Sequence, residues 1–153
     1  MSKIDRFIGS YSFLNNFHPS TIFVDGKSYR TVEHAYQACK ASTSSEREII
    51  RCAAEPMEAK RLGKSVILPP DWEMKKVGLM KDLVRKKFEN PLLREMLRTT
   101  GDAELIHDNR FNDRFWGVSK GAGENWLGRI LTEIRQEIFD EDGDLTDVQC
   151  DTL

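Results

Sequence analysis

The stretch TIFVDGKSYRTVEHAYQACK, residues 21–40, decides how the chain begins to fold. Two short runs of β-forming residues flank Asp25 and Gly26, a pair that readily supplies the positive φ angles of a tight hairpin turn. Thr31 then stands where a helix N-cap is preferred, and Glu33 lies in the first turn, where a carboxylate suits the helix dipole. The stretch therefore predicts a compact β-hairpin that leads directly into a helix.

Helix signals dominate the rest of the chain. Apolar residues recur at three- and four-residue spacing after Asp71 and again before Phe139, as on the buried face of an amphipathic helix. The first 20 residues lack such a period and are expected to be irregular. We predict one compact, mostly helical α+β domain with a small β-hairpin or sheet. Its helices are expected at about residues 31–41, 45–54, 56–62, 71–89, 91–98 and 125–139, and one strand at 103–107.

The end of the chain differs in charge from the part before it. Residues 140–153 hold six acidic residues and no lysine or arginine. Such a segment cannot bury enough apolar surface to offset the entropy of ordering, so we predict a folded domain over 1–139 and a disordered tail. The rest of the chain has 19 acidic and 23 basic residues, which gives the predicted domain a net charge of about +4. This charge suits a phosphorylated ligand but is too small to indicate nucleic-acid binding by itself.

Composition argues against export and against a membrane protein. No stretch of the chain approaches 18 uninterrupted apolar residues, so no membrane span is expected. The first residues, MSKIDRF, have no apolar run behind their basic residue and do not resemble a signal peptide. Cys39, Cys52 and Cys150 are widely spaced and form no CxxC pair, which favours a reducing compartment. We therefore predict a cytoplasmic protein.

The predicted helix after Thr31 carries four polar side chains on one face. They are Glu33 and the residues three, four and seven positions after it, Tyr36, Gln37 and Lys40. These offsets return to almost the same angle around a helix. A carboxylate, a phenol, an amide and an amine on one rigid element could form a catalytic surface. The same spacing also suits a solvated face with an exposed ladder of charges. The residues alone leave both interpretations open.

A second candidate is the segment FNDRFWGVSKGAGENWLG, residues 111–128. It places Asp113, Trp116 and Asn125 among four glycines just before a helix, where free N–H groups can receive a phosphate. Trp116 could stack on a base. The glycines form neither GxGxxG nor a Walker motif, so a plain connecting loop with a buried tryptophan is an equal interpretation.

Taken in order, the motifs of the chain resemble one known family. The chain has FLNNF at 13–17, VDGKSY at 24–29, TVEHAYQACK at 31–40, NDRFWG at 112–117 and NWLG at 125–128. The YbiA-like family, also called NADAR, typically shows F-L-S-N-F, then V-D-G-K-x-Y/W, then T-x-E-H-x-x-Q-x-x-K, with matching motifs downstream. One departure is the asparagine at the third position of the first motif, and we assign it no role. The ordered set covers nearly all of the predicted domain.

The resemblance implies a YbiA-like fold and N-glycosidase activity. Members of the family are associated with early phosphorylated intermediates of riboflavin synthesis, and others with removal of ADP-ribose from modified guanine. Both substrates join a ribose C1′ to an exocyclic amine on a pyrimidinone or guanine-like ring. The resemblance implies catalytic roles for Glu33, Lys40 and Asp113, and substrate contacts from Asn16, Phe17, Tyr36, Gln37, Trp72, Trp116, Gly117 and Asn125.

Two mechanisms are compatible with these residues. In the first, Glu33 activates water or supports an oxocarbenium-like sugar while another group protonates the leaving amine. In the second, the sugar ring opens and Lys40 captures C1′ as a Schiff base, which requires a neutral amine. The charge of Glu33 would oppose that neutral form. In either mechanism Asp113 would hydrogen-bond the ribose or the base, and Trp116 would stack.

Neither mechanism needs a metal or an organic cofactor, and His18, His34 and His107 lack metal-ligand spacing. The expected partner is a small nucleotide-like substrate, with modified nucleic acid as the other candidate. Two non-catalytic alternatives stay open. An ADP-ribose-binding module would keep the tryptophan loop but would not need Glu33 together with Lys40. A protein-interaction domain would use the acidic tail as its contact.

Overall fold

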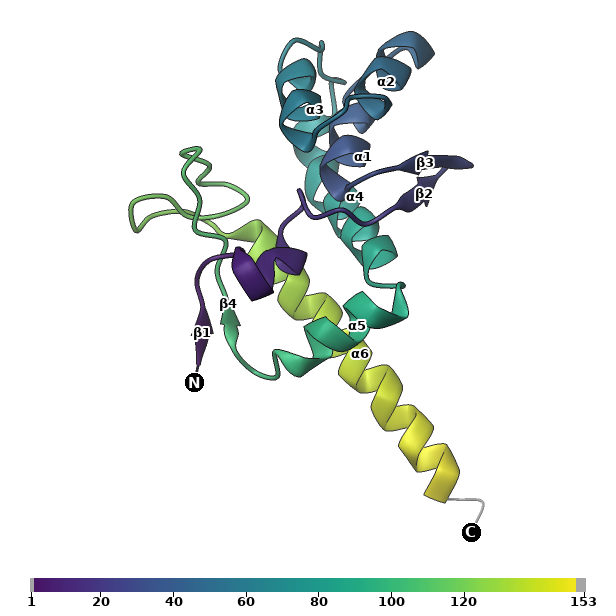
Figure 1. Cartoon of the computed structure of the whole chain (residues 1–153), viewed down its shortest axis with the longest axis vertical. Coiled ribbons are helices and arrows are strands. Elements are labelled where there is room, and N and C mark those ends of the chain that lie inside the picture. The colour runs from purple at the N-terminus through teal and green to yellow at the C-terminus, as the bar shows by residue number, and fades with distance from the viewer. Residues whose placement is uncertain (1, 151–153) are drawn as a thin grey trace. The chain divides into compact units, whose positions relative to one another are not determined.

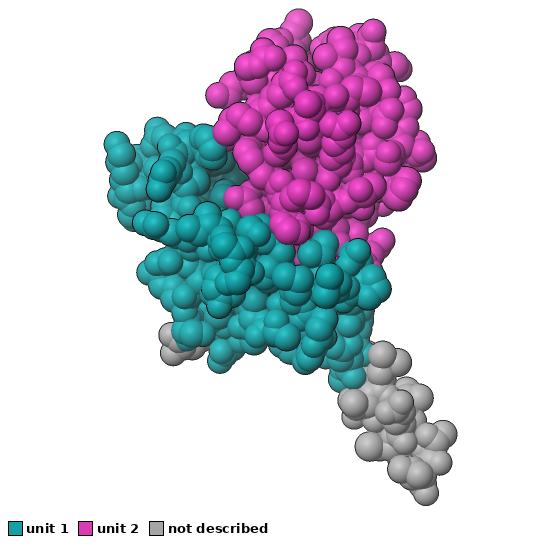
Figure 2. Space-filling model, viewed as in Figure 1, with its two compact units in different colours: residues 1–14, 90–153 teal, residues 15–89 magenta. Residues whose placement is uncertain are grey.

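A computed structural model of the chain describes residues 2–150, and within 144–150 it describes the backbone alone. The residues group into two compact units that we describe one at a time (Figure 2). Unit 1 comprises Met1–Leu14 and Asn90–Leu153, and unit 2 comprises Asn15–Glu89. Helices dominate both units and each contains a two-stranded sheet, so the predicted mostly helical α+β class is confirmed.

Unit 2 begins with the predicted hairpin. Asp25 and Gly26 adopt φ angles of 51° and 79°, as a tight two-residue turn between antiparallel strands requires. The pairing joins Ile22 to Tyr29, and both of these side chains are buried. The elements of the unit are β2 (Ile22–Val24), β3 (Lys27–Tyr29), α1 (Val32–Cys39), α2 (Ser44–Arg51), α3 (Pro56–Gly63) and α4 (Trp72–Lys87) (Figure 1).

Helix α1 is the buried element of unit 2 and packs against α2, α3 and α4. Its N-cap is Thr31, as predicted, and the Thr31 hydroxyl accepts a hydrogen bond from the backbone N–H of His34. The His34 ring is fully buried, with Nδ1 2.7 Å from the Thr31 hydroxyl and Nε2 3.0 Å from the Ala53 carbonyl. Both ring nitrogens of His34 therefore serve the structure of the helix.

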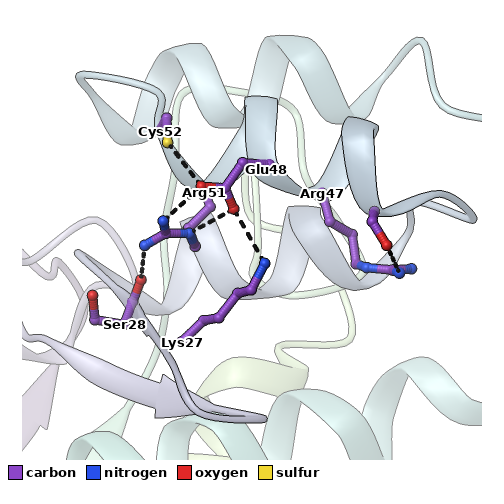
Figure 3. A network of polar contacts seen from close by, with 7 residues as sticks. Lys27, Ser28, Arg47, Glu48, Arg51 and Cys52 are labelled. Carbon is purple, nitrogen blue, oxygen red and sulfur yellow. Dashed lines mark hydrogen bonds and ion pairs between the residues drawn. The ribbon is translucent and has the colours of Figure 1, made fainter.

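A polar network joins α2 to the hairpin (Figure 3). The carboxylate of Glu48 accepts hydrogen bonds from Arg51 at 2.6 and 2.9 Å and lies 3.5 Å from the Lys27 ammonium. Arg51 also donates to the Ser28 carbonyl at 3.1 Å. The paired guanidinium lowers the pKa of Glu48 to about 2. Since these groups are partly exposed, the network orients the hairpin more than it stabilises the unit.

Unit 1 contains elements that are distant in sequence. A two-residue strand, β1 (Lys3–Ile4), pairs in parallel with β4 (Glu104–Leu105), with Ile4 opposite Leu105. A 3-10 helix, Gly9–Leu14, follows β1, so the expectation of irregular structure over the first 20 residues is wrong in part. The strand expected over 103–107 is present but only two residues long.

The core of unit 1 lies between two helices, α5 (Pro91–Thr99) and α6 (Trp126–Cys150). Arg94 on α5 forms ion pairs with Glu141 and Asp142 on α6, at 3.1 and 2.9 Å. Helix α6 continues past residue 139, where it was predicted to end, to Cys150, and residues 151–153 lie outside the described part. The disorder of the tail stays a prediction. None of the described helices is long and apolar enough to cross a membrane. The buried apolar side chains of α5 and α6 are Leu93, Leu97, Leu127, Ile130, Leu131, Ile134 and Ile138.

Candidate active site

The polar face of α1 lies inside the protein. Glu33 is 8% exposed, Tyr36 is 5% exposed and Gln37 is 4% exposed, while Lys40 at the C-cap is partly exposed. An exposed ladder of charges is therefore ruled out for this face. A buried carboxylate is costly unless other groups hold it, so its surroundings indicate what it does.

Gln37 holds the Glu33 carboxylate in place. The Gln37 side-chain nitrogen donates to one Glu33 oxygen at 2.7 Å, across one turn of α1. The Gln37 oxygen lies against Gly63 of α3, where a Cβ would come within 1.9 Å of it. Among the described residues this oxygen has no hydrogen-bond partner. The amide nitrogen of Gln37 thus orients Glu33, and the contact of Gln37 with substrate stays a prediction.

Lys40 lies over two aromatic rings. Its ammonium is 5.1 Å from the ring centre of Tyr36 and 6.0 Å from that of Trp72, the first residue of α4. The two rings are 5.4 Å apart and tilted by 47°. Both the aromatic faces and the C-terminal end of α1 attract positive charge.

The loop before β2 contacts the start of α1. The carbonyl of Asn16 accepts a hydrogen bond from the backbone N–H of Glu33 at 3.2 Å. The side-chain nitrogen of Asn16 lies 3.5 Å from the Met80 sulfur on α4, and its side-chain oxygen is buried without a partner in the part of the chain that the structure describes. Phe17 is half-buried, and its N–H donates to the Asn15 side chain at 2.9 Å. The backbone of Asn16 is therefore bonded to Glu33, and the buried side-chain oxygen of Asn16 is available to accept a further hydrogen bond.

A buried lysine in unit 2 was not among the candidates from the sequence. Lys87, at the end of α4, is 2% exposed, and its ammonium donates to the Asn15 carbonyl at 2.9 Å. Burial lowers the pKa of Lys87 to about 7. The signal that could have revealed it is the spacing of Met80, Val84 and Lys87, which are four and three residues apart and all buried.

In unit 1, Asp113 organises the loop that carries Trp116. One Asp113 carboxylate oxygen accepts from the backbone N–H groups of Phe115 and Trp116, at 3.0 and 2.9 Å. Asn109 donates to the Asp113 carbonyl at 2.8 Å. The Trp116 ring is half-buried and meets the Phe115 ring edge-on, with centres 4.8 Å apart. This oxygen of Asp113 therefore shapes the turn at Trp116.

Asn125 and Gly117 hold the same loop against β4. The Asn125 side chain donates to the Leu105 carbonyl and accepts from the His107 N–H, both at 2.9 Å. A side chain at Gly117 would come within 2.0 Å of the His107 carbonyl. Asn125 itself has a φ of 56°, in the region that asparagine tolerates. Gly117 and Asn125 therefore both help to fix the backbone conformation of the loop.

The candidate residues fall into two groups. In unit 2 the structure brings together Asn16, Glu33, Tyr36, Gln37, Lys40 and Trp72, with Phe17 in the adjoining loop. In unit 1 it brings together Asp113, Trp116, Gly117 and Asn125. The expectation that Asp113 and Trp116 contact the same substrate as Glu33 stays a prediction.

Comparisons with known proteins agree with the motifs. A family model described as the NADAR domain matches residues 6–139. N-glycosidase Npun_R5314 of Nostoc punctiforme is 40% identical over 135 residues, 84% of this chain and 86% of that protein. N-glycosidase YbiA of Escherichia coli is 39% identical over 132 residues, 84% of this chain and 82% of that protein. The NMR structure of E. coli YbiA matches with a TM-score of 0.82, covering 93% of this chain and 89% of that chain.

A longer protein is also similar. Riboflavin biosynthesis protein VVA0006 of Vibrio vulnificus is 37% identical over 133 residues, which are 84% of this chain and 36% of that protein. The similar region is thus one part of a larger protein there. The motifs quoted from the sequence, the family model and the matching structure all indicate the same relatives.

Proposed function

The chain belongs to the NADAR domain family, and on that premise we propose that it is an N-glycosidase. The bond that it hydrolyses joins a ribose C1′ to an exocyclic amine of a pyrimidinone or guanine-like base. Candidate substrates are phosphorylated intermediates of riboflavin synthesis and ADP-ribosylated guanine. The names of the relatives, N-glycosidase and riboflavin biosynthesis protein, support the reaction class and the first of these substrates.

The observation that carries the proposal is the Glu33 carboxylate. The carboxylate is buried, and Gln37 donates a hydrogen bond to one of its oxygens. The backbone N–H of Glu33 donates to the Asn16 carbonyl. A carboxylate held in this way keeps its position while a proton moves, which is what general base catalysis requires.

We favour direct hydrolysis over the Schiff-base mechanism. Glu33 accepts a proton from water, and the water oxygen forms a bond to C1′. The electrons of the C1′–N bond return to the amine, which takes up a proton from solvent as it leaves, and Glu33 afterwards releases its proton to solvent. The products are a sugar with a C1′ hydroxyl and the free amine of the base. Glu33 also stabilises positive charge that develops on the sugar.

The surroundings of Lys40 support this choice. A lysine that attacks C1′ must be neutral, whereas the Tyr36 and Trp72 rings and the end of α1 favour its ammonium. A protonated Lys40 can instead bind a phosphate or a sugar oxygen. We propose that the aromatic rings of Tyr36 and Trp72 contact the substrate, together with Asn16, Phe17 and Gln37. Asp113 and Trp116, with Gly117 and Asn125, stay proposed contacts to the ribose and base.

The first test follows C–N bond cleavage by mass spectrometry. The protein, Glu33→Gln and the control Glu95→Gln are incubated with a phosphoribosylamino-pyrimidinone and with an ADP-ribosylated guanine oligonucleotide. We expect the wild type to release sugar phosphate or ADP-ribose, and Glu33→Gln to lose at least about a hundredfold in rate. The control removes a carboxylate whose side chain is 54% exposed and ion-paired on α5, so its rate should stay that of the wild type.

The outcomes separate the proposals. Release from one substrate and not from the other identifies the substrate class. If folded wild-type protein cleaves neither, the substrate assignment is wrong and a nucleotide-binding module becomes the better explanation. Equal rates for the wild type and Glu33→Gln would remove the carboxylate from the mechanism.

A further inference from the structure

Lys87 carries a buried amine that the proposed mechanism does not use. It lies on the face of α4 that also carries Met80 and Val84, and all three side chains are buried. Two side chains on that face, Met80 and Lys87, contact the loop before β2. Met80 sulfur lies 3.5 Å from the Asn16 side-chain nitrogen, and Lys87 Nζ lies 2.9 Å from the Asn15 carbonyl.

The loop makes a tight turn around the atom that Lys87 contacts. The Asn15 carbonyl accepts the His18 N–H at 3.1 Å in addition to the lysine, and the Asn15 side chain accepts the Phe17 N–H. Both acceptor groups of Asn15 are therefore used to close the turn over Asn15–His18. The lysine adds a third hydrogen bond, which comes from outside the turn.

The Asn15–His18 turn also contacts the first turn of helix α1. Its Asn16 carbonyl accepts the N–H of Glu33, which is one of the helix N–H groups that have no partner within α1. The chain of contacts thus runs from Lys87 through Asn15 and Asn16 to Glu33. We propose that Lys87 is a positioning residue, which holds the Asn15–His18 turn and through it the backbone of Glu33. This inference rests on the proposed role of Glu33.

Filling space alone would not require an amine at this position. A methionine has nearly the same length and would bury without the cost of removing an ammonium from water. The pKa of Lys87 is lowered by that burial, and the pKa of His18 is lowered by its own burial and by the Lys87 charge. A cost in stability that a simpler side chain would avoid is typical of residues that serve a site.

Amide hydrogen exchange and steady-state kinetics together test the proposal. The variant is Lys87→Met, and the matched control is Lys86→Met, the exposed lysine next to it on α4. The Glu33 N–H reports the contact directly, because its hydrogen bond goes to Asn16 and not to the helix. We expect Lys87→Met to speed exchange at Glu33 and His18 by about tenfold while the core of α1 keeps its protection.

The kinetic readout separates positioning from a purely structural role. We expect kcat of Lys87→Met to fall by about tenfold or more while KM changes little, because the misplaced carboxylate affects the reaction more than binding. Lys86→Met should match the wild type in both measurements. Faster exchange with an unchanged kcat would overturn the proposal, and so would unchanged exchange.

The same experiments distinguish a failure of the proposed N-glycosidase function from a failure of the proposed role of Lys87. If the wild type cleaves neither candidate substrate, the N-glycosidase assignment fails, and this is seen before any variant is compared. Exchange at Glu33 and His18 still shows whether Lys87 holds the turn, because it needs no substrate. Loss of protection throughout α1 in Lys87→Met would mean that the lysine supports the whole unit, and the positioning role would be wrong.

Discussion

The Glu33 carboxylate accepts a hydrogen bond from Gln37, whose carboxamide fits because residue 63 has no side chain. A Cβ at Gly63 would lie 1.9 Å from the Gln37 oxygen, so Gly63→Ala must displace the amide that orients Glu33. Overpacking of a buried site typically costs about 1–3 kcal/mol. We expect Gly63→Ala to lower the free energy of unfolding by that amount and to reduce kcat. Denaturant titration and cleavage assays measure the two effects.

Gly78→Ala is the matched control for this substitution. Gly78 lies in the middle of α4, and a Cβ there would meet no atom within 4 Å. Alanine in an open helical position is favoured over glycine by about 0.5–1 kcal/mol, so this variant should be slightly more stable and fully active. Wild-type kcat in folded Gly63→Ala would show that Gln37 does not position the carboxylate.

The two mechanisms also differ at a single residue, Lys40. A Schiff base between Lys40 and C1′ would be reduced by borohydride to a stable amine that keeps the sugar on the lysine. Direct hydrolysis forms no such bond, and the rings that stabilise the Lys40 ammonium oppose it. We expect peptide mass spectrometry of borohydride-quenched reactions to find no sugar on Lys40. A sugar adduct there, absent from Lys40→Arg, would establish the Schiff-base mechanism.

At the scale of elements, local signals allowed the hairpin and most helices to be predicted. Asp25 and Gly26 specify their turn by the φ angles they tolerate, and Thr31 specifies the start of α1 by its hydroxyl. Pro56 marks the first residue of α3 for a similar local reason. Each of these features depends on residues within one turn of chain, which a single sequence contains.

The elements that were missed depend on distant partners. Strand β1 exists because Lys3 and Ile4 pair with residues about a hundred positions later, and two residues show no periodicity. The burial of Glu33 was equally invisible, because its spacing on α1 suits an exposed face as well as a buried one. The structural use of Asp113 and Asn125 follows from loop geometry that the resemblance did not imply.

At the scale of the whole molecule, the buried Lys87 links stability to pH. Its pKa is about 7 in the folded protein and has the ordinary value of 10.5 in the unfolded chain. Between these two values the unfolded state binds more protons at this residue, so the contribution of Lys87 to the free energy of unfolding rises with pH across this range. The pKa values of His18 and His34 are also lowered by burial, which makes stability rise with pH near their ordinary value of 6.5 as well.

The Lys87 contribution can be isolated with the variants described above. A pKa difference between about 7 and 10.5 corresponds to roughly 5 kcal/mol of stability gained between these pH values. We expect the wild type and Lys86→Met to gain stability from pH 6 to pH 10 in urea titrations. Lys87→Met should be more stable than the wild type at pH 6, because it buries no ammonium, and the difference should shrink as the pH rises. Parallel curves for Lys87→Met and the wild type would mean that the Lys87 amine stays charged in the folded protein, held at low cost by the Asn15 carbonyl.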